Sequence, residues 1–328
     1  MATRETQLEE QIFSIDSPRA FVDCVLKVFR FQYSTNAVYK AYVDARNVNP
    51  NQVDSLEKIP FLPISFFKTH TVVSSVLPVK LVFESSGTTG SVPSKHNVCV
   101  PEMYYRASQT MFESIYGNVS EYVIIALLPS YIERENSSLV HMVQQFIQKS
   151  QYKESGFFLN ADGDFLSVFS KYPHEKILCV GVSFALVDFA QNNSVSHPHV
   201  VVMETGGMKG RLKEIIRTEL HQILMPAFGV SSIHSEYGMT ELLSQSYAVK
   251  NGEFIHPPWM GVFVRDLYDP YSLVPNNVPG GINIIDLANL YSCAFIETQD
   301  IGRKISNTHF TVEGRIDSAD IRGCSLMI

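Results

Sequence analysis

Residues 85–95 read Ser-Ser-Gly-Thr-Thr-Gly-Ser-Val-Pro-Ser-Lys, a combination of residue types that suits anion binding. Glycines let the backbone turn tightly and approach a ligand closely. Successive backbone N–H groups and hydroxyls in such a loop form an anion-binding cavity. Lys95 adds a positive charge suited to phosphate. The stretch therefore predicts a loop that holds a polyphosphate, lined by Ser85, Ser86, Gly87, Thr88, Thr89 and Gly90.

The alternative is a polar surface turn, because Ser, Thr and Gly all favour turns. The stretch is not a Walker A loop, which has Gly-Lys-Ser/Thr after four spacer residues. The G-x-G-x-x-G fingerprint of dinucleotide-binding proteins does not occur in the sequence. A nucleotide site here would therefore belong to another family.

A second polar cluster, at residues 235–241, reads Ser-Glu-Tyr-Gly-Met-Thr-Glu and follows a predicted strand. Ligands of open α/β sheets bind beyond the carboxyl ends of strands. Glu241 is suited to Mg²⁺, which takes oxygen ligands and bridges phosphates, and Tyr237 is suited to stacking on a purine. A helix start is the alternative, since Glu is common just after Thr at such positions. The other candidate residues of this cluster are Glu236, Gly238, Met239 and Thr240.

Three more polar clusters follow or accompany predicted strands. Residues 204–211 read Glu-Thr-Gly-Gly-Met-Lys-Gly-Arg, where Gly206 and Gly207 permit close backbone approach to a ligand. Residues 300–303 read Asp-Ile-Gly-Arg, and residues 314–317 read Gly-Arg-Ile-Asp. The candidate binding residues in these last two clusters are Asp300 and Arg315.

Composition excludes several classes of function. The 328 residues are 45% hydrophobic and 18% charged, which is typical of a globular protein. The net charge of −7 gives no support to binding of nucleic acid or of an anionic membrane surface. No apolar run approaches the ~20 residues of a membrane span, and the polar start predicts no signal peptide.

The five cysteines are scattered, with no C-x-x-C pair, so neither a disulfide framework nor a zinc site is expected. This usage predicts a cytoplasmic protein. Four of the cysteines lie in or beside apolar stretches and are predicted to be core residues: Cys24, Cys99, Cys179 and Cys293. Cys324 stands apart, in the sequence Asp-Ile-Arg-Gly-Cys-Ser. Its neighbouring arginine favours the nucleophilic thiolate, while the alternative is a small buried cysteine.

The elements that must position these residues predict an α/β protein. Apolar spacing indicates helices at 8–13, 19–33 and 37–44, with Ser17 and Pro18 as cap and first turn of the second. Residues 59–67 are aromatic and proline-rich, as expected for core packing or for the wall of a pocket. From residue 79 strands and helices alternate, which predicts a mainly parallel sheet covered by helices. The strands are expected at 79–83, 122–128, 177–182, 200–203, 231–235 and 245–249, and the helices at 102–116, 137–151, 163–171, 184–191 and 209–224.

The pattern changes after residue 253. Short strands without crossover helices are expected at 262–266, 281–286, 293–298 and 309–312, which indicates an antiparallel β subdomain. The predicted organisation is therefore an α/β core with N-terminal helices at residues 1–253 and a β subdomain with a tail at residues 254–328.

Taken in order, the five clusters resemble the adenylate-forming superfamily of acyl-CoA synthetases, adenylation domains and luciferases. Residues 85–95 look like its phosphate loop, and Tyr237 to Glu241 match its Tyr-Gly-x-Thr-Glu motif residue for residue. Residues 314–317 resemble its Gly-Arg-x-Asp hinge motif. Within the superfamily the chain is most similar to the acyl-protein synthetases of bacterial luminescence fatty-acid reductase systems, and next to phenylacetate-CoA ligases.

The resemblance implies a reaction: ATP-dependent activation of a carboxylic acid, expected to be a fatty acid, to an acyl-adenylate, followed by transfer to a thiol. It implies that Lys95 and the phosphate loop hold the phosphates, that Glu241 holds Mg²⁺, and that Asp300 with Arg315 binds ribose. Tyr237 and the backbone of Gly206 and Gly207 would flank adenine. The implied partners are the acid, coenzyme A as an alternative acceptor, and an acyl reductase subunit.

Two departures from the superfamily stand out. The phosphate loop has Val-Pro-Ser-Lys where Lys usually follows Pro directly, and the sequence ends at Ile328, where a C-terminal domain with a catalytic lysine is usual. We therefore expect that domain to be absent and, by resemblance, Cys324 to accept the acyl group. A degenerate, non-catalytic partner of an acyl reductase remains an alternative. A hydrolase with Ser183 as nucleophile, Asp266 and His309 is a further one, because residues 181–185 resemble a nucleophile elbow.

Overall fold

The computed structural model describes residues 4–85, 92–129, 136–206 and 215–316. The chain divides into two compact units that interleave along the sequence. The first unit is Met1–Ala107, Met239–Ser244 and Ile255–Ile328, and the second is Ser108–Gly238 and Gln245–Phe254. The predicted organisation, with a boundary at residues 253 and 254, remains a prediction.

The second unit contains the predicted mainly parallel sheet. β4 (Tyr122–Leu127) pairs in parallel with β5 (Gly156–Phe158) and β6 (Lys176–Val182), and β6 is followed by β7 (Val200–Thr205) and β8 (His234–Tyr237), also parallel. β9 (Ser246–Ala248) then joins β8 antiparallel. β4 is buried along its whole length because both faces are covered by helices.

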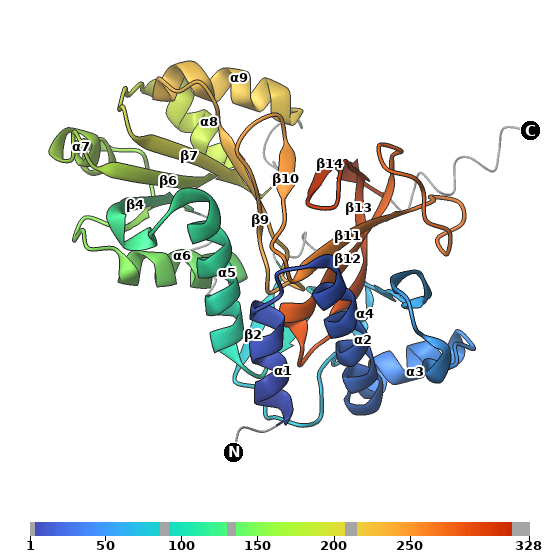
Figure 1. Ribbon diagram of the computed structural model, residues 1–328. Coiled ribbons are helices and arrows are strands. Elements are labelled where there is room, and N and C mark those ends of the chain that lie inside the picture. The colour runs from blue at the N-terminus through green and yellow to red at the C-terminus, as the bar shows by residue number, and fades with distance from the viewer. Residues whose placement is uncertain (1–3, 86–91, 130–135, 207–214, 317–328) are drawn as a thin grey trace, which may run out of the picture. The chain divides into compact units, whose positions relative to one another are not determined.

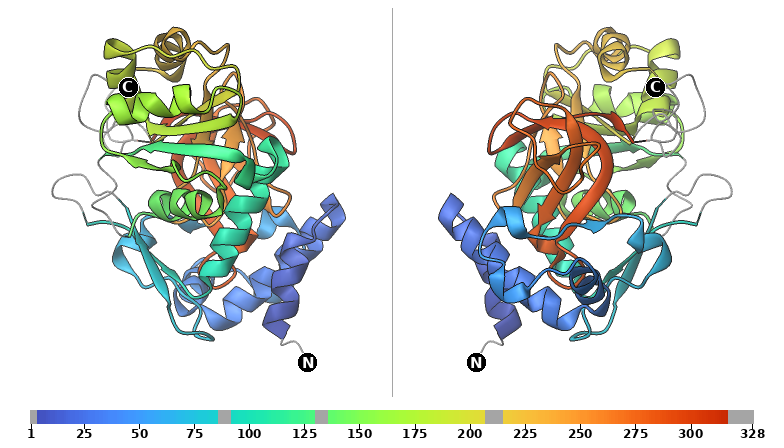
Figure 2. Two further views of the ribbon diagram at one scale, coloured as in Figure 1. Left: turned by 90° about the vertical axis from the view of Figure 1, so that its left-hand side faces the viewer. Right: turned by 90° about the vertical axis from the view of Figure 1, so that its right-hand side faces the viewer.

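Helices cover both faces of this sheet. α8 (Ser183–Asn192) and α9 (Arg217–Phe228) lie on one face, and α6 (Ser138–Lys149) lies on the other (Figures 1 and 2). Ser137 and Asp162 cap α6 and α7 (Gly163–Lys171), since each side chain accepts a backbone N–H of the first turn. The expected α/β class and parallel sheet are confirmed.

The first unit is built around an antiparallel sheet. β11 (Met260–Arg265), β12 (Gly280–Asp286), β13 (Phe295–Lys304) and β14 (His309–Arg315) pair in sequence order, each antiparallel to the next. β1 (Leu62–Pro63) adds a short parallel pairing to β13. The predicted antiparallel β region after residue 253 is therefore confirmed.

Helices at the start of the chain pack on this sheet. α1 (Arg4–Phe13), α2 (Pro18–Thr35) and α3 (Ala37–Ala45) match the predicted positions, and Ser17 caps α2 with Pro18 in its first turn as expected. Phe29 and Tyr39 meet Phe295 of β13 in one aromatic cluster. Gln32 is fully buried and has all its polar atoms bonded to the backbone of residues 289–294, which removes the penalty of burying an amide.

Some remaining elements complete the two units. They are α4 (Phe66–Thr69), α5 (Pro101–Tyr116), β10 (Glu253–Ile255), and the short 3₁₀ helices η1 (Pro50–Gln52), η2 (Leu56–Lys58), η3 (Val119–Glu121) and η4 (Leu287–Asn289). Among the described residues, no helix combines the length and apolarity needed to cross a bilayer.

The structure corrects the prediction at residues 79–83. The strand there, β2, is Leu81–Glu84, and only Phe83 is buried. It does not start the parallel sheet, because it pairs antiparallel with β3 (Lys95–Val98), a strand that the sequence did not indicate, in a separate two-stranded sheet. A β-hairpin needs only a local loop, and alternating burial in β3 is too short to be recognised in the sequence.

Other boundaries also moved. Residues 209–214 of the helix expected at 209–224 lie outside the described residues, and the described helix, α9, is Arg217–Phe228, which continues through Pro226 and is capped by Gly229. Asp300 and Arg303 were expected after a strand at 293–298, but β13 runs to Lys304 and includes both. β5 and β10, of three residues each, were not predicted.

Candidate active site

The predicted phosphate loop connects the two strands of the β2–β3 hairpin. Its ends are joined by two hydrogen bonds: the Ser85 backbone N–H donates to the Ser94 carbonyl at 3.0 Å, and the Ser94 N–H donates to Ser85 Oγ at 2.8 Å. Residues 86–91 lie outside the described residues, and with them the predicted Ser86, Gly87, Thr88, Thr89 and Gly90. The hairpin thus fixes where this loop begins and ends.

Lys95 is the first residue of β3 and lies opposite Glu84 of β2. Its Nζ is 3.2 Å from Glu84 Oε1, and its side chain is 58% exposed. An ion pair this exposed contributes little to stability. The ammonium of Lys95 is therefore held beside the loop by a partner that a phosphate could replace.

Glu241 is buried, with only 6% of its surface exposed. Burial raises the pKa of its carboxyl, and the negative charge of Asp300 acts in the same direction. A hydrogen bond from the Ser94 side chain and the positive charge of Arg315 oppose this rise in pKa. The first unit thus gathers Glu241 with residues of the hairpin and of the antiparallel sheet.

Asp300 and Arg315 are directly opposed in β13 and β14. Arg315 Nε is 3.5 Å from Asp300 Oδ1, and the Asp300 side chain is 11% exposed while that of Arg315 is 52% exposed. A carboxylate with an arginine beside it offers both an acceptor for sugar hydroxyls and a donor for anions. The two residues that the sequence assigned to one ligand group do lie together.

The second unit holds the predicted residues Gly206, Glu236, Tyr237 and Gly238. Gly206 follows β7 with φ of 68°, a conformation that favours glycine, and its carbonyl accepts a hydrogen bond from Ser183 Oγ at 2.9 Å. Gly207 lies outside the described residues. The side chain of Glu236, at the end of β8, accepts a hydrogen bond from Thr205 of β7. Burial is the main cause that raises the pKa of Glu236 to about 7, and the charge of Glu204 adds to it.

Tyr237 ends β8 with its ring buried and 5.7 Å from the ring of Phe254. Gly238 is the last residue of the second unit in this motif, while Met239, Thr240 and Glu241 belong to the first. A Cβ at Gly238 would overlap Oε1 of Glu236, so a larger residue there would require the Glu236 side chain to move. The Tyr-Gly-x-Thr-Glu motif is therefore shared between the units.

The hydrolase alternative loses support at Ser183. This residue is 2% exposed, and its hydroxyl donates to the Gly206 carbonyl rather than to a histidine. A nucleophile must be accessible and must meet a general base. Ser183 instead fastens the start of α8 to the end of β7.

Three polar residues near the motif were missed by sequence reasoning: His96, Asp286 and Asn289. All three are fully buried. His96 Nδ1 lies 2.8 Å from the Thr240 carbonyl, Asn289 donates to the Glu241 carbonyl at 2.8 Å, and Asp286 accepts from the Leu243 and Ser244 N–H groups at 2.9 Å each. The available signal was a polar residue inside an otherwise apolar stretch, which alone does not name a partner.

Residues 59–67 were expected either to pack in the core or to form the wall of a pocket. Leu62 and Phe67 are almost fully buried. Ile59, Pro60 and Phe61 also border a cavity of the first unit together with Arg46, whose guanidinium lies 3.6 Å from the centre of the Tyr271 ring. The stretch therefore packs the core and contributes to a cavity wall.

The expected core cysteines are confirmed. Cys24, Cys99, Cys179 and Cys293 are all buried. Burial raises the pKa of the Cys24 thiol to about 11 and that of Cys293 to about 12. Thiols with such pKa values carry almost no thiolate near neutrality. Cys324, the fifth cysteine, lies outside the described residues.

Solved structures with the same fold are adenylate-forming enzymes. The open conformation of 2-hydroxyisobutyryl-CoA ligase, in complex with 2-HIB-AMP and CoA, matches with a TM-score of 0.65 at 13% identity. The match covers 92% of this chain and 70% of the ligase chain. ATP-bound MatB from Rhodopseudomonas palustris has a TM-score of 0.52 at 14% identity. An ATP-bound RpMatB-BxBclM chimera has a TM-score of 0.53 at 14% identity.

These likenesses define the class, an α/β protein with the fold of adenylate-forming enzymes. The matches to MatB and to the chimera cover 71% of this chain. This chain spans only 47% of the length of those two proteins. The family described as acyl-protein synthetase, LuxE, matches the chain over residues 13–328. The chain belongs to this acyl-protein synthetase family. A comparison with curated proteins found no match.

Proposed function

We propose that this protein activates a carboxylic acid, in the first instance a fatty acid, with ATP and then transfers the acyl group to the thiol of Cys324. The observation that carries the proposal is the grouping in the first unit of Glu241, Asp300 and Arg315 beside the hairpin that bears the phosphate loop. Membership of the acyl-protein synthetase family supports the same reaction.

The donor set in the first unit fits Mg²⁺ brought in with a nucleotide. Magnesium in such sites is bound by one or two carboxylates together with phosphates and water. Glu241 supplies a buried carboxylate, and among the described residues no group of three or more His, Cys, Asp and Glu side chains converges as a protein-only metal site would require. Bound there, Mg²⁺ would neutralise phosphate charge.

In the first step, a carboxylate oxygen of the acid attacks the α-phosphorus of ATP. The new bond joins the acid to AMP, and the bond to the β-phosphate oxygen breaks so that pyrophosphate leaves. This reaction depends on positioning and charge neutralisation. Lys95 would hold the phosphates beside the loop, and Asp300 with Arg315 would orient the ribose. Tyr237 and Gly206 are proposed to contact the adenine.

In the second step, a thiolate attacks the acyl carbon, a carbon–sulfur bond forms, and AMP leaves with the electrons of the broken carbon–oxygen bond. The four described cysteines are buried and are poor nucleophiles. Their burial supports Cys324 as the acceptor. A diffusible thiol, coenzyme A, is the second candidate, favoured by the likeness to a solved CoA ligase. An acyl reductase that takes the group from Cys324 is the proposed partner.

Intact-protein mass spectrometry with ATP, Mg²⁺ and a panel of acids tests the proposal. We expect wild-type protein to gain one acyl group that hydroxylamine removes. Cys324→Ser should lose the acyl group and keep carboxylate-dependent ATP–pyrophosphate exchange, while the buried control Cys99→Ser should keep both. Free acyl-CoA with an unmodified protein would favour the CoA ligase instead. Absence of exchange with every acid would favour a non-catalytic partner protein.

A further inference from the structure

The segment 240–244, which carries Glu241, has neither helical nor strand structure, so its backbone groups must bond elsewhere. Fully buried side chains meet this need. His96 lies 2.8 Å from the Thr240 carbonyl, Asn289 donates to the Glu241 carbonyl, and Asp286 accepts from the Leu243 N–H. The path of the backbone at Glu241 is therefore set by side chains from other parts of the first unit.

His96 differs from the other two because it belongs to the hairpin that carries the phosphate loop. Ser94, Lys95 and His96 are consecutive, and side chains alternate along a strand. Lys95 is exposed and pairs with Glu84, whereas His96 is fully buried. The Ser94 side chain lowers the pKa of the Glu241 carboxyl against the effect of burial, and His96 bonds to the backbone just before it. One short stretch of chain thus acts on the Glu241 carboxyl and on the peptide that precedes it.

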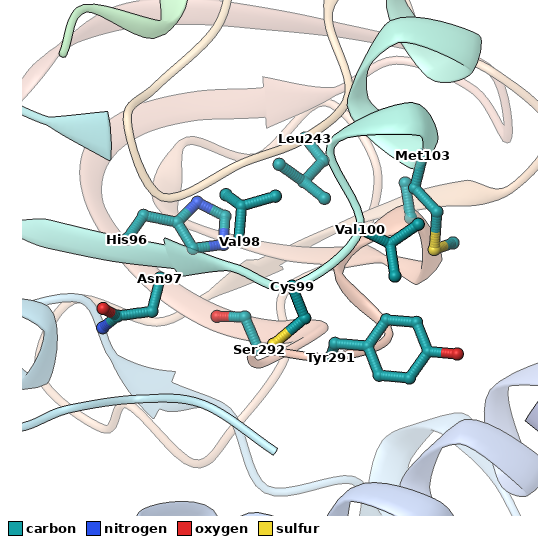
Figure 3. A pocket seen from close by; sticks show the side chains of 10 residues that line it. His96, Asn97, Val98, Cys99, Val100, Met103, Leu243, Tyr291 and Ser292 are labelled. Carbon is teal, nitrogen blue, oxygen red and sulfur yellow. The ribbon is translucent and has the colours of Figure 1, made fainter. Parts of the chain in front are cut away.

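The chemistry of the contact fixes the role of each atom. A carbonyl oxygen only accepts, so Nδ1 of His96 carries the proton and donates to Thr240. Nε2 has no hydrogen-bond partner within the described part of the chain. His96, Val98 and Leu243 line a cavity of about 10 Å³ (Figure 3). This is about the volume that one water requires. The imidazole is therefore not aimed at an open ligand cleft.

We propose that His96 is a positioning residue: its Nδ1–H bond to the Thr240 carbonyl holds Glu241 in the orientation that binds the magnesium of Mg²⁺–ATP. The inference rests on the proposed function, and it adds a residue that neither the motif nor the family match identifies. Through His96, the strand that presents Lys95 to the phosphates also sets the direction of the Glu241 carboxylate. In this proposal, β3 sets the distance between the Lys95 ammonium and the Glu241 carboxylate.

Two substitutions separate this role from simple packing. The side-chain amide nitrogen of Asn lies near the position of Nδ1, whereas that of Gln lies near the position of Nε2. His96→Asn should therefore keep the bond to Thr240, and His96→Gln should lose it. Thermal unfolding of both variants checks that the fold is retained.

The readout is the Mg²⁺ concentration that gives half-maximal ATP–pyrophosphate exchange, measured beside the KM for the acid. We expect H96Q to raise this Mg²⁺ concentration by about tenfold or more with a KM for the acid within twofold of wild type. H96N should stay within about threefold of wild type in both quantities. If H96Q lowers kcat with an unchanged Mg²⁺ requirement, or if the two variants respond alike, His96 does not position the metal ligand.

Calorimetric ATP binding, with Mg²⁺ or with EDTA, gives a test without turnover. Wild type and H96N should bind ATP more tightly with Mg²⁺, and H96Q should lose most of this preference. Wild-type binding without a preference for Mg²⁺ would overturn the inference, whereas preserved Mg²⁺-dependent binding without any exchange would overturn only the proposed function. If H96Q does not fold, Asn289→Leu removes the neighbouring bond to the Glu241 carbonyl. The same shift in Mg²⁺ requirement is expected for N289L, and an unshifted requirement would count against the inference.

Discussion

Asp300 and Arg315 lie opposite each other on β13 and β14, with 3.5 Å between Oδ1 and Nε. Two motifs separated in the sequence thereby become one pair of side chains. The same two strands carry a second ion pair, between Arg303 and Glu313, with 2.8 Å between Nε and Oε1. Substitution of Arg303 is therefore a control for substitution of Arg315.

Arg315→Ala should weaken ATP binding. Loss of a hydrogen bond to a charged group costs about 1.5–3 kcal/mol, which corresponds to an increase of about 10- to 100-fold in the KM for ATP. Arg303→Ala removes an arginine from the same strands and should change that KM less than threefold, because Arg303 pairs with Glu313 and is not proposed to contact the nucleotide. Steady-state pyrophosphate exchange measures both constants. Equal effects of the two substitutions would count against the proposed role of Arg315 in binding ribose.

Glu241→Gln should abolish acid activation while leaving the fold intact. The amide keeps the shape of the side chain but lacks the negative charge needed by a metal ion, so we expect the rate of pyrophosphate exchange to fall at least about 100-fold. Glu297→Gln is a matched control, because burial raises the pKa of that carboxyl too and its partner is Arg265. Exchange near the wild-type rate in E241Q would show that Glu241 does not hold the metal.

Low pH should destabilise the folded protein in part through protonation of His96. Burial lowers the pKa of this imidazole from 6.5 to about 4. Between these values the unfolded chain binds a proton that the folded chain does not, so this contribution to stability is complete above pH 6.5 and is lost as pH falls toward 4. One pKa unit corresponds to about 1.4 kcal/mol, which gives a loss of about 2 kcal/mol between pH 7 and pH 5.

Denaturant unfolding of wild type and His96→Asn at these two pH values measures the effect. The asparagine does not titrate in this range, so H96N should lose about 2 kcal/mol less than wild type on acidification. Identical losses in the two proteins would mean that His96 is protonated at its ordinary pKa in the folded state.

Gly302→Ala should be far more damaging than Gly314→Ala. A Cβ at Gly302 would overlap the backbone carbonyl oxygen of Thr311 on the neighbouring strand, whereas a Cβ at Gly314 meets no atom within 4 Å. Because the obstacle at Gly302 is backbone, relief requires separation of β13 from β14, and we expect a loss of at least about 2 kcal/mol. Thermal unfolding compares the two. A G302A variant as stable as G314A would contradict the close approach of the strands.

Several features followed from local patterns in the sequence. Amphipathic spacing and the Ser17–Pro18 cap predicted α2, and continuous apolar runs predicted β4 and β6. These features succeed because helix periodicity and capping are local. The β2–β3 hairpin was missed because its two four-residue strands are too short to show a clear pattern, and strand preference depends on the neighbours that a strand meets.

The sequence by itself determined the class of fold, the core cysteines and the order of the polar motifs, because each is written in residue type and spacing. Only the tertiary structure decided which of these residues meet. Asp300 faces Arg315 through strand register, and Thr240 reaches His96 across 144 positions of the chain. Such contacts arise because most buried polar groups are hydrogen-bonded, and the partner is chosen by the packing of distant elements rather than by neighbours in the sequence.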